Sequence, residues 1–121
     1  MKKIIYIDDD ELNTQLFKMN FRNKYEVYTT LNPLNGISMI KNENIKVIIT
    51  DYKMPEMNGM ELINEVKKFQ PESVCMVLSA YLESEVITEK HKIFKYMMKP
   101  YKREELNKNI EEAFNLLQNA D

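Results

Sequence analysis

The sequence predicts an α/β domain in which five parallel strands form one sheet with helices on both faces. Two observations support this class. Short apolar runs without alternation, such as Ile4–Ile7 and Val47–Thr50, are typical of strands buried on both faces, and such strands belong to parallel sheets. Longer amphipathic segments separate the runs, and this alternation of strand and helix places helices on both sides of the sheet.

Five segments have strand character, and no repeat or internal linker separates them. The 121 residues are therefore expected to form one domain, 1–121. The predicted strands are Lys3–Ile7, Tyr25–Thr29, Lys46–Thr50, Val74–Ser79 and Lys95–Met98.

The first two helices are predicted from an apolar stripe and from a pair of capping residues. Leu12, Leu16 and Met19 recur at i, i+4 and i+7, which predicts a helix that turns this face toward the core. Asn32 is a suitable N-cap and Pro33 suits the first helical position, so the second helix should begin there.

The later helices follow the same periodicity. Leu62, Val66 and Phe69 predict the third helix. The fourth, at Ser84–Lys92, has the weakest apolar face. The C-terminal helix is predicted to bury one face, made of Leu106, Ile110, Ala113, Phe114 and Leu117.

Composition excludes several classes of protein. Hydrophobic residues make up 44% and charged residues 30%, which is ordinary for a globular domain. The net charge of −2 gives no electrostatic reason to expect direct nucleic-acid binding. No apolar stretch approaches the roughly 20 residues of a membrane helix, and the single cysteine, Cys75, lies in an apolar run where a buried, reduced thiol is expected. We therefore expect a cytoplasmic protein without membrane insertion.

Acidic residues follow two of the predicted strands. Asp8 and Asp9 come directly after the first strand, and Asp51 comes directly after the third. Since ligands of such sheets bind beyond the carboxyl ends of the strands, the three carboxylates should share one functional edge. Two carboxylates about 4 Å apart repel by roughly 4 kcal/mol at an effective dielectric near 20, which favours a bound cation. A small oxygen-only ligand set suits Mg²⁺, and a carboxylate beside Mg²⁺ can form an acyl phosphate.

Two more strand ends supply residues that suit phosphoryl chemistry. Ser79 closes the fourth predicted strand and Lys99 follows the fifth. A phosphoryl oxygen could accept a hydrogen bond from the Ser79 hydroxyl and a charge-assisted one from the Lys99 ammonium.

With these motifs in order, the chain resembles the receiver domain of two-component response regulators over essentially its whole length. The motifs that carry the resemblance are Ile5-Tyr6-Ile7-Asp8-Asp9-Asp10, Thr50-Asp51-Tyr52-Lys53-Met54-Pro55-Glu56-Met57-Asn58-Gly59, Leu78-Ser79-Ala80-Tyr81 and Lys99-Pro100. The resemblance implies a flavodoxin-like sheet with strand order 2-1-3-4-5.

The resemblance also implies a role for each matching residue. Asp51 matches the phospho-accepting aspartate, Asp9 the direct Mg²⁺ ligand, and Asp8 the acidic partner that acts through water. The other implied roles are a backbone carbonyl ligand to Mg²⁺ at Lys53, a switch hydroxyl at Ser79, a conserved-type lysine at Lys99, an aromatic that moves inward at Tyr96, and a cis Lys99-Pro100 bond.

The implied function is that of a response regulator. A sensor histidine kinase or a histidine phosphotransfer protein would donate a phosphoryl group to Asp51 with Mg²⁺. The face built by the fourth helix, the fifth strand and the fifth helix would then change and engage a downstream protein. We expect a monomer or a weak phosphorylation-dependent dimer. Because the domain would catalyse only its own phosphorylation and dephosphorylation, it is not expected to be an enzyme in the ordinary sense.

Purely structural roles for some residues, and two alternative classes of protein, remain open. Asp10 and Glu11 are expected only to start the first helix, and Tyr96 could be a plain core aromatic. A Mg²⁺-dependent phosphatase with an aspartate nucleophile shares the chemistry, but it needs a second acid where this chain has Lys53. A receiver module cut from a larger regulator or hybrid kinase is the second alternative, and we favour a single-domain relay over it.

Lys53 and Tyr81 place a cation and an aromatic ring beside the predicted phosphorylation site. We hypothesise that these side chains partly cover the acyl phosphate and slow its attack by water.

Overall fold

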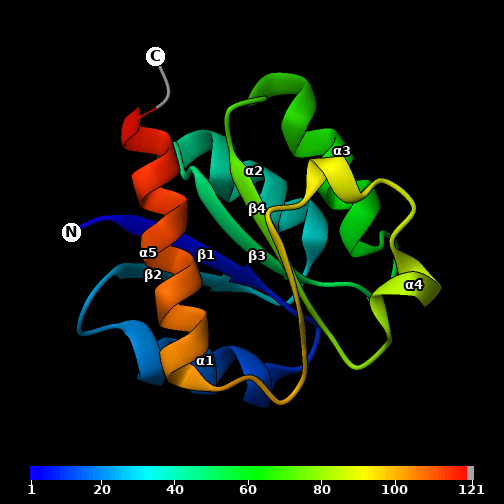
Figure 1. Cartoon of the computed structure of the whole chain (residues 1–121), viewed down its shortest axis with the longest axis horizontal. Helices are drawn as coiled ribbons and strands as arrows, with labels where there is room; N and C mark the ends of the chain where they lie inside the picture. The colour runs from blue at the N-terminus through cyan, green and yellow to red at the C-terminus, as the bar shows by residue number, and fades with distance from the viewer. Residues whose placement is uncertain (120–121) are drawn as a thin grey trace.

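The computed structural model describes residues 1–119 of the chain (Figure 1). Five strands form one sheet in the order β2-β1-β3-β4-β5, and every neighbouring pair is parallel. The strands are β1 (Lys3–Ile7), β2 (Glu26–Thr30), β3 (Val47–Asp51), β4 (Val74–Ser79) and β5 (Lys95–Met98). The predicted fold class, strand order and strand positions are confirmed, with β2 and β3 displaced by one residue.

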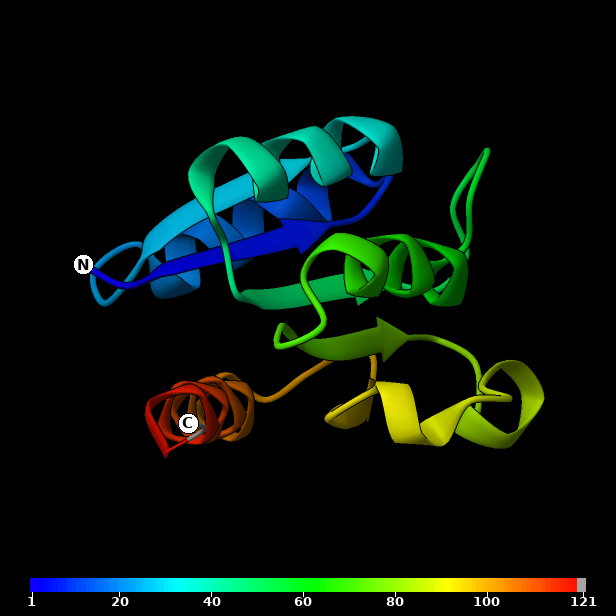
Figure 2. The ribbon, with the colours of Figure 1, turned by 90° about the horizontal axis from the view of Figure 1, so that it is seen from above.

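The helices cover both faces of this sheet, as predicted. They are α1 (Glu11–Phe21), α2 (Pro33–Glu43), α3 (Gly59–Phe69), α4 (Glu83–Val86), the 3₁₀ turn η1 (Lys90–Lys92) and α5 (Arg103–Asn119). In Figure 2, α2 and α3 lie in front of the strands and α1 lies behind them. One core cluster joins the sheet to α1 and α5, and the other joins it to α2 and α3. Within residues 1–119 no helix combines the length and the apolar character needed to cross a bilayer.

Local capping fixes the starts of α1 and α2 as the sequence predicted. The Asn32 side chain accepts hydrogen bonds from the backbone N–H groups of Leu34 and Asn35, with Pro33 at the first helical position. The Asp10 side chain caps α1 in the same way and takes part in no metal cluster among the described residues. Asp10 and Glu11 therefore start a helix, as expected.

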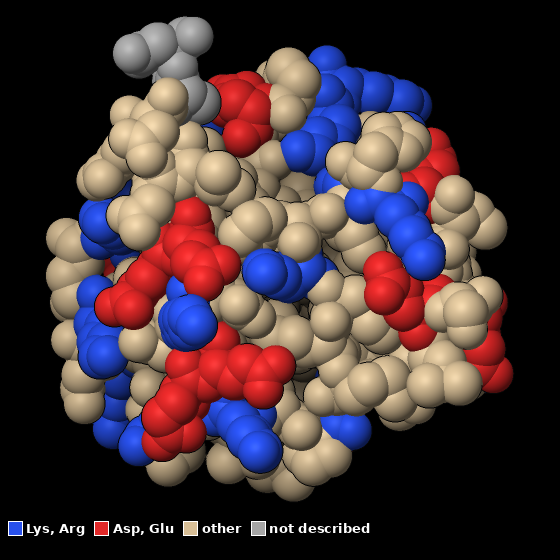
Figure 3. Space-filling model, in the orientation of Figure 1, with Lys and Arg blue, Asp and Glu red and all other residues tan. Residues whose placement is uncertain are grey.

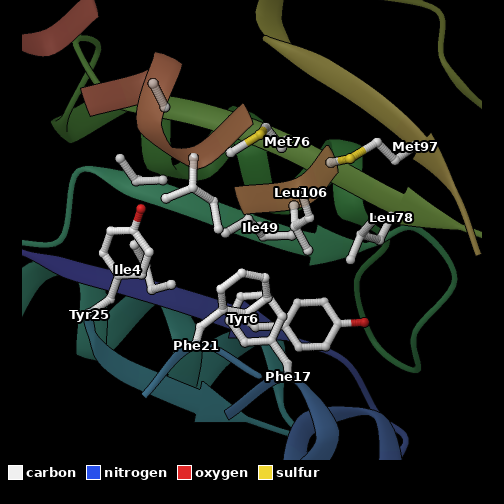
Figure 4. Close-up of a cluster of buried hydrophobic side chains, with 13 residues drawn as sticks. Ile4, Tyr6, Phe17, Phe21, Tyr25, Ile49, Met76, Leu78, Met97 and Leu106 are labelled. Carbon is white, nitrogen blue, oxygen red and sulfur yellow. The ribbon is translucent and has the colours of Figure 1, made fainter. Parts of the chain in front are cut away.

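The predicted core face of α1 is wrong. Leu12, Leu16 and Met19 are 62%, 46% and 61% exposed. The helix instead buries Phe17 and Phe21, which belong to an aromatic group in the core (Figure 4). Both sets have helical spacing, so periodicity alone could not choose between them. The two phenyl rings bury more apolar area, and burial of apolar area decides the orientation of the helix.

The predicted fourth helix, Ser84–Lys92, is also wrong as a continuous element. Only the single turn α4 forms, followed by extended residues and the short turn η1. The run Val86-Ile87-Thr88 is β-branched, which disfavours a helix. Ile87 adopts an extended conformation and is buried in the core, so it anchors this segment without a helix.

The remaining predicted core positions divide between buried and partly buried. Leu62 and Val66 of α3 are fully buried, whereas Phe69 is 37% exposed. Leu106, Ile110 and Ala113 of α5 are fully buried, and Phe114 and Leu117 pack against that core from partly buried positions.

Candidate functional site

Three carboxylates meet at the carboxyl edge of the sheet. Asp8 and Asp9 directly follow β1, and Asp51 ends the neighbouring strand β3. Each offers one carboxylate oxygen, and these oxygens lie within 4.8 Å of one another. Asp8 is fully buried, Asp51 is partly buried and Asp9 is exposed. Adjacent parallel strands that end in aspartate therefore gather the acidic residues as the sequence predicted.

Lys99 bridges two of these carboxylates. Its Nζ lies 2.7 Å from Oδ2 of Asp8 and 3.1 Å from Oδ2 of Asp51. The lysine follows β5, and the bond to Pro100 is cis, as the resemblance implied. The ammonium thus partly neutralises the acidic cluster from the side of β5.

Burial and the lysine act differently on the two aspartates. Burial alone would raise the pKa of Asp8, but hydrogen bonds from Lys99, Tyr6 and the Asp10 amide together lower it. Burial raises the pKa of Asp51, and attraction to Lys99 only partly offsets this. Although burial would lower the pKa of Lys99, its bonds to the two carboxylates raise it, so the lysine stays charged.

The donor set fits a magnesium ion. Asp8, Asp9 and Asp51 offer oxygen atoms alone, from a compact group at an open edge. Oxygen ligands in small number, with room for water, are what Mg²⁺ prefers. A divalent cation would also relieve the repulsion among the carboxylates.

Two donors to Asp8 were missed by the sequence analysis. The Tyr6 hydroxyl donates to Oδ2 of Asp8 at 2.5 Å, and the Asn13 amide donates to the same oxygen at 3.2 Å. Burial raises the pKa of the Tyr6 phenol and the charge of Asp8 raises it further, so the phenol remains a donor. One signal was available, since residues i and i+2 of a strand share a face.

The backbone of Tyr81 joins Ser79 to Tyr96. Its N–H donates to Oγ of Ser79 at 3.0 Å, and its carbonyl accepts a hydrogen bond from the Tyr96 hydroxyl. Ser79 is fully buried at the end of β4, and Tyr96 packs against the core from β5. The predicted switch hydroxyl and switch aromatic therefore contact one residue of the loop that leads into α4.

Lys53 and Tyr81 form a contact across the edge of the site. The Nζ of Lys53 lies 3.3 Å from the Tyr81 hydroxyl and 5.8 Å from the centre of its ring. Lys53 comes from the loop after Asp51, and Tyr81 comes from the loop after Ser79. The two side chains connect the loops that follow β3 and β4.

Gly59 allows α3 to begin directly against Asp51. A Cβ atom at Gly59 would lie 2.6 Å from the backbone oxygen of Asp51 and 3.1 Å from Cα of Tyr52. Since backbone atoms cannot move aside as a flexible side chain can, Gly59→Ala is expected to lower the free energy of unfolding by about 2–3 kcal/mol. Urea denaturation measures this change.

Gly36→Ala is the matched control for Gly59→Ala. Its Cβ would meet Cδ1 of Ile7 at 2.7 Å and Cγ1 of the same residue at 3.1 Å, so it meets side-chain atoms and no backbone atom. The clash is therefore offset by the higher helix propensity of alanine, and stability should stay within about 1 kcal/mol of the wild type. Equal losses for the two variants would contradict the argument.

Known proteins resemble this chain along nearly its whole length. The chemotaxis protein CheY homolog of Campylobacter jejuni is 32% identical over 119 residues, covering 92% of this chain and 91% of that protein. The DNA-binding transcriptional regulator NtrC of Azospirillum brasilense is 34% identical, covering 93% of this chain and 24% of NtrC. A response regulator receiver domain protein of Clostridium thermocellum superposes with a TM-score of 0.90 at 28% identity, covering 98% of both chains.

The fold and its acidic edge define the class: a flavodoxin-like α/β domain with the architecture of CheY-like receivers. The sequence profile of the response regulator receiver domain matches residues 4–111. The chain belongs to the response regulator receiver domain family of two-component signalling. Receiver domains are signalling modules that interact with histidine kinases and downstream effectors.

Proposed function

We propose that this chain accepts a phosphoryl group on Asp51 from a histidine kinase or a histidine phosphotransfer protein. The observation that carries the proposal is the Lys99 ammonium, which lies 3.1 Å from Oδ2 of Asp51 and is held there by the buried Asp8. The half-buried Asp51 carboxylate is the nucleophile, and Lys99 is placed to attract the oxygens of an incoming phosphoryl group.

The transfer step is a displacement at phosphorus. An oxygen of Asp51 forms the new O–P bond while the N–P bond of the donor phosphohistidine breaks. The leaving imidazole nitrogen keeps the electron pair and takes a proton from solvent. Asp8, Asp9, Asp51 and the backbone carbonyl of Lys53 would hold Mg²⁺, which supplies positive charge against the phosphoryl oxygens.

The signal would leave the site through Ser79 and Tyr96. An acyl phosphate at Asp51 offers oxygens that can accept a hydrogen bond from the Ser79 hydroxyl, which now accepts one from the Tyr81 amide. A change at Ser79 reaches the Tyr81 backbone, and through its carbonyl the Tyr96 hydroxyl. The surface built by α4, β5 and α5 would therefore change when Asp51 is phosphorylated.

The proposed partners are proteins. The cognate kinase or phosphotransfer protein approaches the carboxyl edge, and a downstream protein contacts the surface of α4, β5 and α5. Figure 3 shows acidic and basic side chains interspersed on the face it presents, as suits protein contacts rather than direct nucleic-acid binding. We propose a cytoplasmic monomer, or a dimer that forms weakly on phosphorylation.

Incubation with a small-molecule phosphodonor and Mg²⁺, followed by intact mass measurement, tests the proposal. The expected result is the gain of one phosphoryl group. No gain is expected when a chelator removes Mg²⁺ before the donor is added. No gain at saturating donor would overturn the proposal.

Removing the Lys53 contact should shorten the life of the acyl phosphate. Lys53→Ala is expected to raise the rate of dephosphorylation about twofold to fivefold, because an exposed cation–π contact contributes about 0.5–1 kcal/mol to the Lys53–Tyr81 pair that we propose to cover the acyl phosphate. The decay of the phosphorylated mass with time measures the rate.

Lys41→Ala is the matched control for Lys53→Ala. It removes a lysine that lies 4.7 Å from the ring centre of Phe69, at the opposite end of α3 from Asp51. This variant should leave the lifetime unchanged. The covering role is wrong if Lys53→Ala also leaves it unchanged.

A further inference from the structure

Tyr6 brings a polar group from the aromatic core to the acidic edge. The side chain is 1% exposed, and its ring stacks on Phe17 with the ring centroids 4.6 Å apart. Figure 4 shows Tyr6 beside Phe17 and Phe21, with its hydroxyl at the margin of the cluster. The hydroxyl donates to Oδ2 of Asp8 at 2.5 Å. The core therefore fixes the position of one donor to a buried carboxylate.

Oδ2 of Asp8 accepts from three donors at once. These are the Tyr6 hydroxyl at 2.5 Å, Nζ of Lys99 at 2.7 Å and Nδ2 of Asn13 at 3.2 Å. Oδ1 accepts from the backbone N–H of Asp10 at 2.9 Å. Because the Asp8 side chain is fully buried, water cannot replace a donor that leaves.

The proposed phosphoryl transfer changes the bonding partners of the Lys99 ammonium. In the unphosphorylated protein its ammonium is shared between Asp8 and Asp51. A phosphoryl group on Asp51 brings further negative oxygens within reach of the same ammonium, which weakens its bond to Asp8. A buried carboxylate that loses one of its cationic partners is destabilised unless other donors remain. Any Mg²⁺ that Asp8 helps to hold is bound before and after the transfer, so the change at Asp8 is the loss of Lys99.

We propose that Tyr6 is a positioning residue for phosphoryl transfer: its hydroxyl keeps Asp8 hydrogen-bonded while Lys99 turns from Asp8 to the phosphoryl group. The inference rests on the proposed function of Asp51. The Tyr6 hydroxyl contributes more when Lys99 has turned away, because within residues 1–119 the Asn13 amide is then the one other protein donor to that oxygen. A group that stabilises the phosphorylated state more than the unphosphorylated one favours phosphorylation of Asp51.

The test measures binding of beryllofluoride, an unreactive phosphoryl analogue, at saturating Mg²⁺. Tyr6→Phe keeps the stacked ring and removes only the hydroxyl. The affinity of this variant for beryllofluoride is expected to fall about tenfold, which corresponds to about 1.4 kcal/mol. Tyr101→Phe is the matched control, because that ring lies in the same aromatic group but its hydroxyl accepts from Asn20 at 2.8 Å. The control should bind as the wild type does.

A double-mutant cycle separates this role from a merely structural one. In a Lys99→Met background no ammonium turns away from Asp8, so Tyr6→Phe should change the affinity less than twofold. A tenfold loss in both backgrounds would overturn the inference, and so would an unchanged affinity in the wild-type background. If the wild type itself binds no beryllofluoride, the proposed function of Asp51 fails and the role of Tyr6 falls with it.

Discussion

Asp51→Asn is expected to abolish phosphoryl incorporation and at the same time to stabilise the fold. The asparagine amide has no nucleophilic carboxylate oxygen, so intact mass should show no gain with saturating phosphodonor and Mg²⁺. Asp10→Asn is the matched control, because the Asp10 side chain caps α1, asparagine caps a helix equally well, and the backbone N–H that donates to Asp8 is kept. The control should gain one phosphoryl group. Incorporation into Asp51→Asn would contradict the assignment of the acceptor.

The stabilising effect of Asp51→Asn follows from the direction of a pKa shift. Burial raises the pKa of Asp51 in the folded protein, so folding disfavours its charged form. The free-energy cost of burying the charged Asp51 carboxylate is absent below its pKa in the unfolded chain, near 4. This cost is fully present once the pH exceeds the pKa of Asp51 in the folded protein. The asparagine variant should therefore melt a few degrees higher at pH 7. This difference should vanish in acid, and thermal melting at several pH values checks both statements.

Lys99→Met is expected to lower the free energy of unfolding by about 3 kcal/mol at neutral pH. The loss is large because the Asp8 side chain is fully buried and its pKa is held low partly by the Lys99 bond. The stability that Asp8 gains from its donors is present above the unfolded pKa and is lost as the pH falls through the folded one. The difference between wild type and Lys99→Met should therefore narrow in acid. Urea denaturation across pH measures it.

Two further variants identify the cause of the loss in Lys99→Met. Lys95→Met removes an exposed lysine whose Nζ lies 3.9 Å from Glu112, and such pairs contribute at most about 1 kcal/mol. Adding Asp8→Asn to Lys99→Met should recover part of the loss, because no unpaired buried charge remains. If the double variant is no more stable than Lys99→Met, the buried carboxylate is not the source of the instability.

Local sequence signals predicted most of the fold and the carboxylate cluster. The strands were evident because strands buried on both faces of a parallel sheet need uninterrupted apolar runs, as in Val47–Thr50. The start of α2 was evident because Asn32 and Pro33 satisfy its first backbone groups without help from the rest of the chain. The three carboxylates could be placed together because each follows a neighbouring strand. The cis Lys99-Pro100 bond, in contrast, followed only from the family resemblance.

The features that escaped prediction depend on competition between distant residues. The face of α1 was decided by Phe17 stacking on Tyr6, which lies on another element. The length of α4 was decided by Ile87, which packs into the core in an extended conformation. The Tyr6 hydroxyl was overlooked because a tyrosine within an apolar strand is consistent with plain core packing. The hydroxyl is recognised as a donor to the site only because Asp8 lies on the same face of the strand.

The single turn of α4 has a thermodynamic consequence for the proposed switch. A segment with few backbone hydrogen bonds of its own sits close in free energy to its alternative conformations. A modest coupling free energy, about 1–3 kcal/mol in typical allosteric proteins, is then enough to redistribute its population. The coupling free energy is the same in both directions, which limits the effect of a partner. A downstream protein that selects one conformation of the segment can stabilise the phosphorylated state by no more than that same amount.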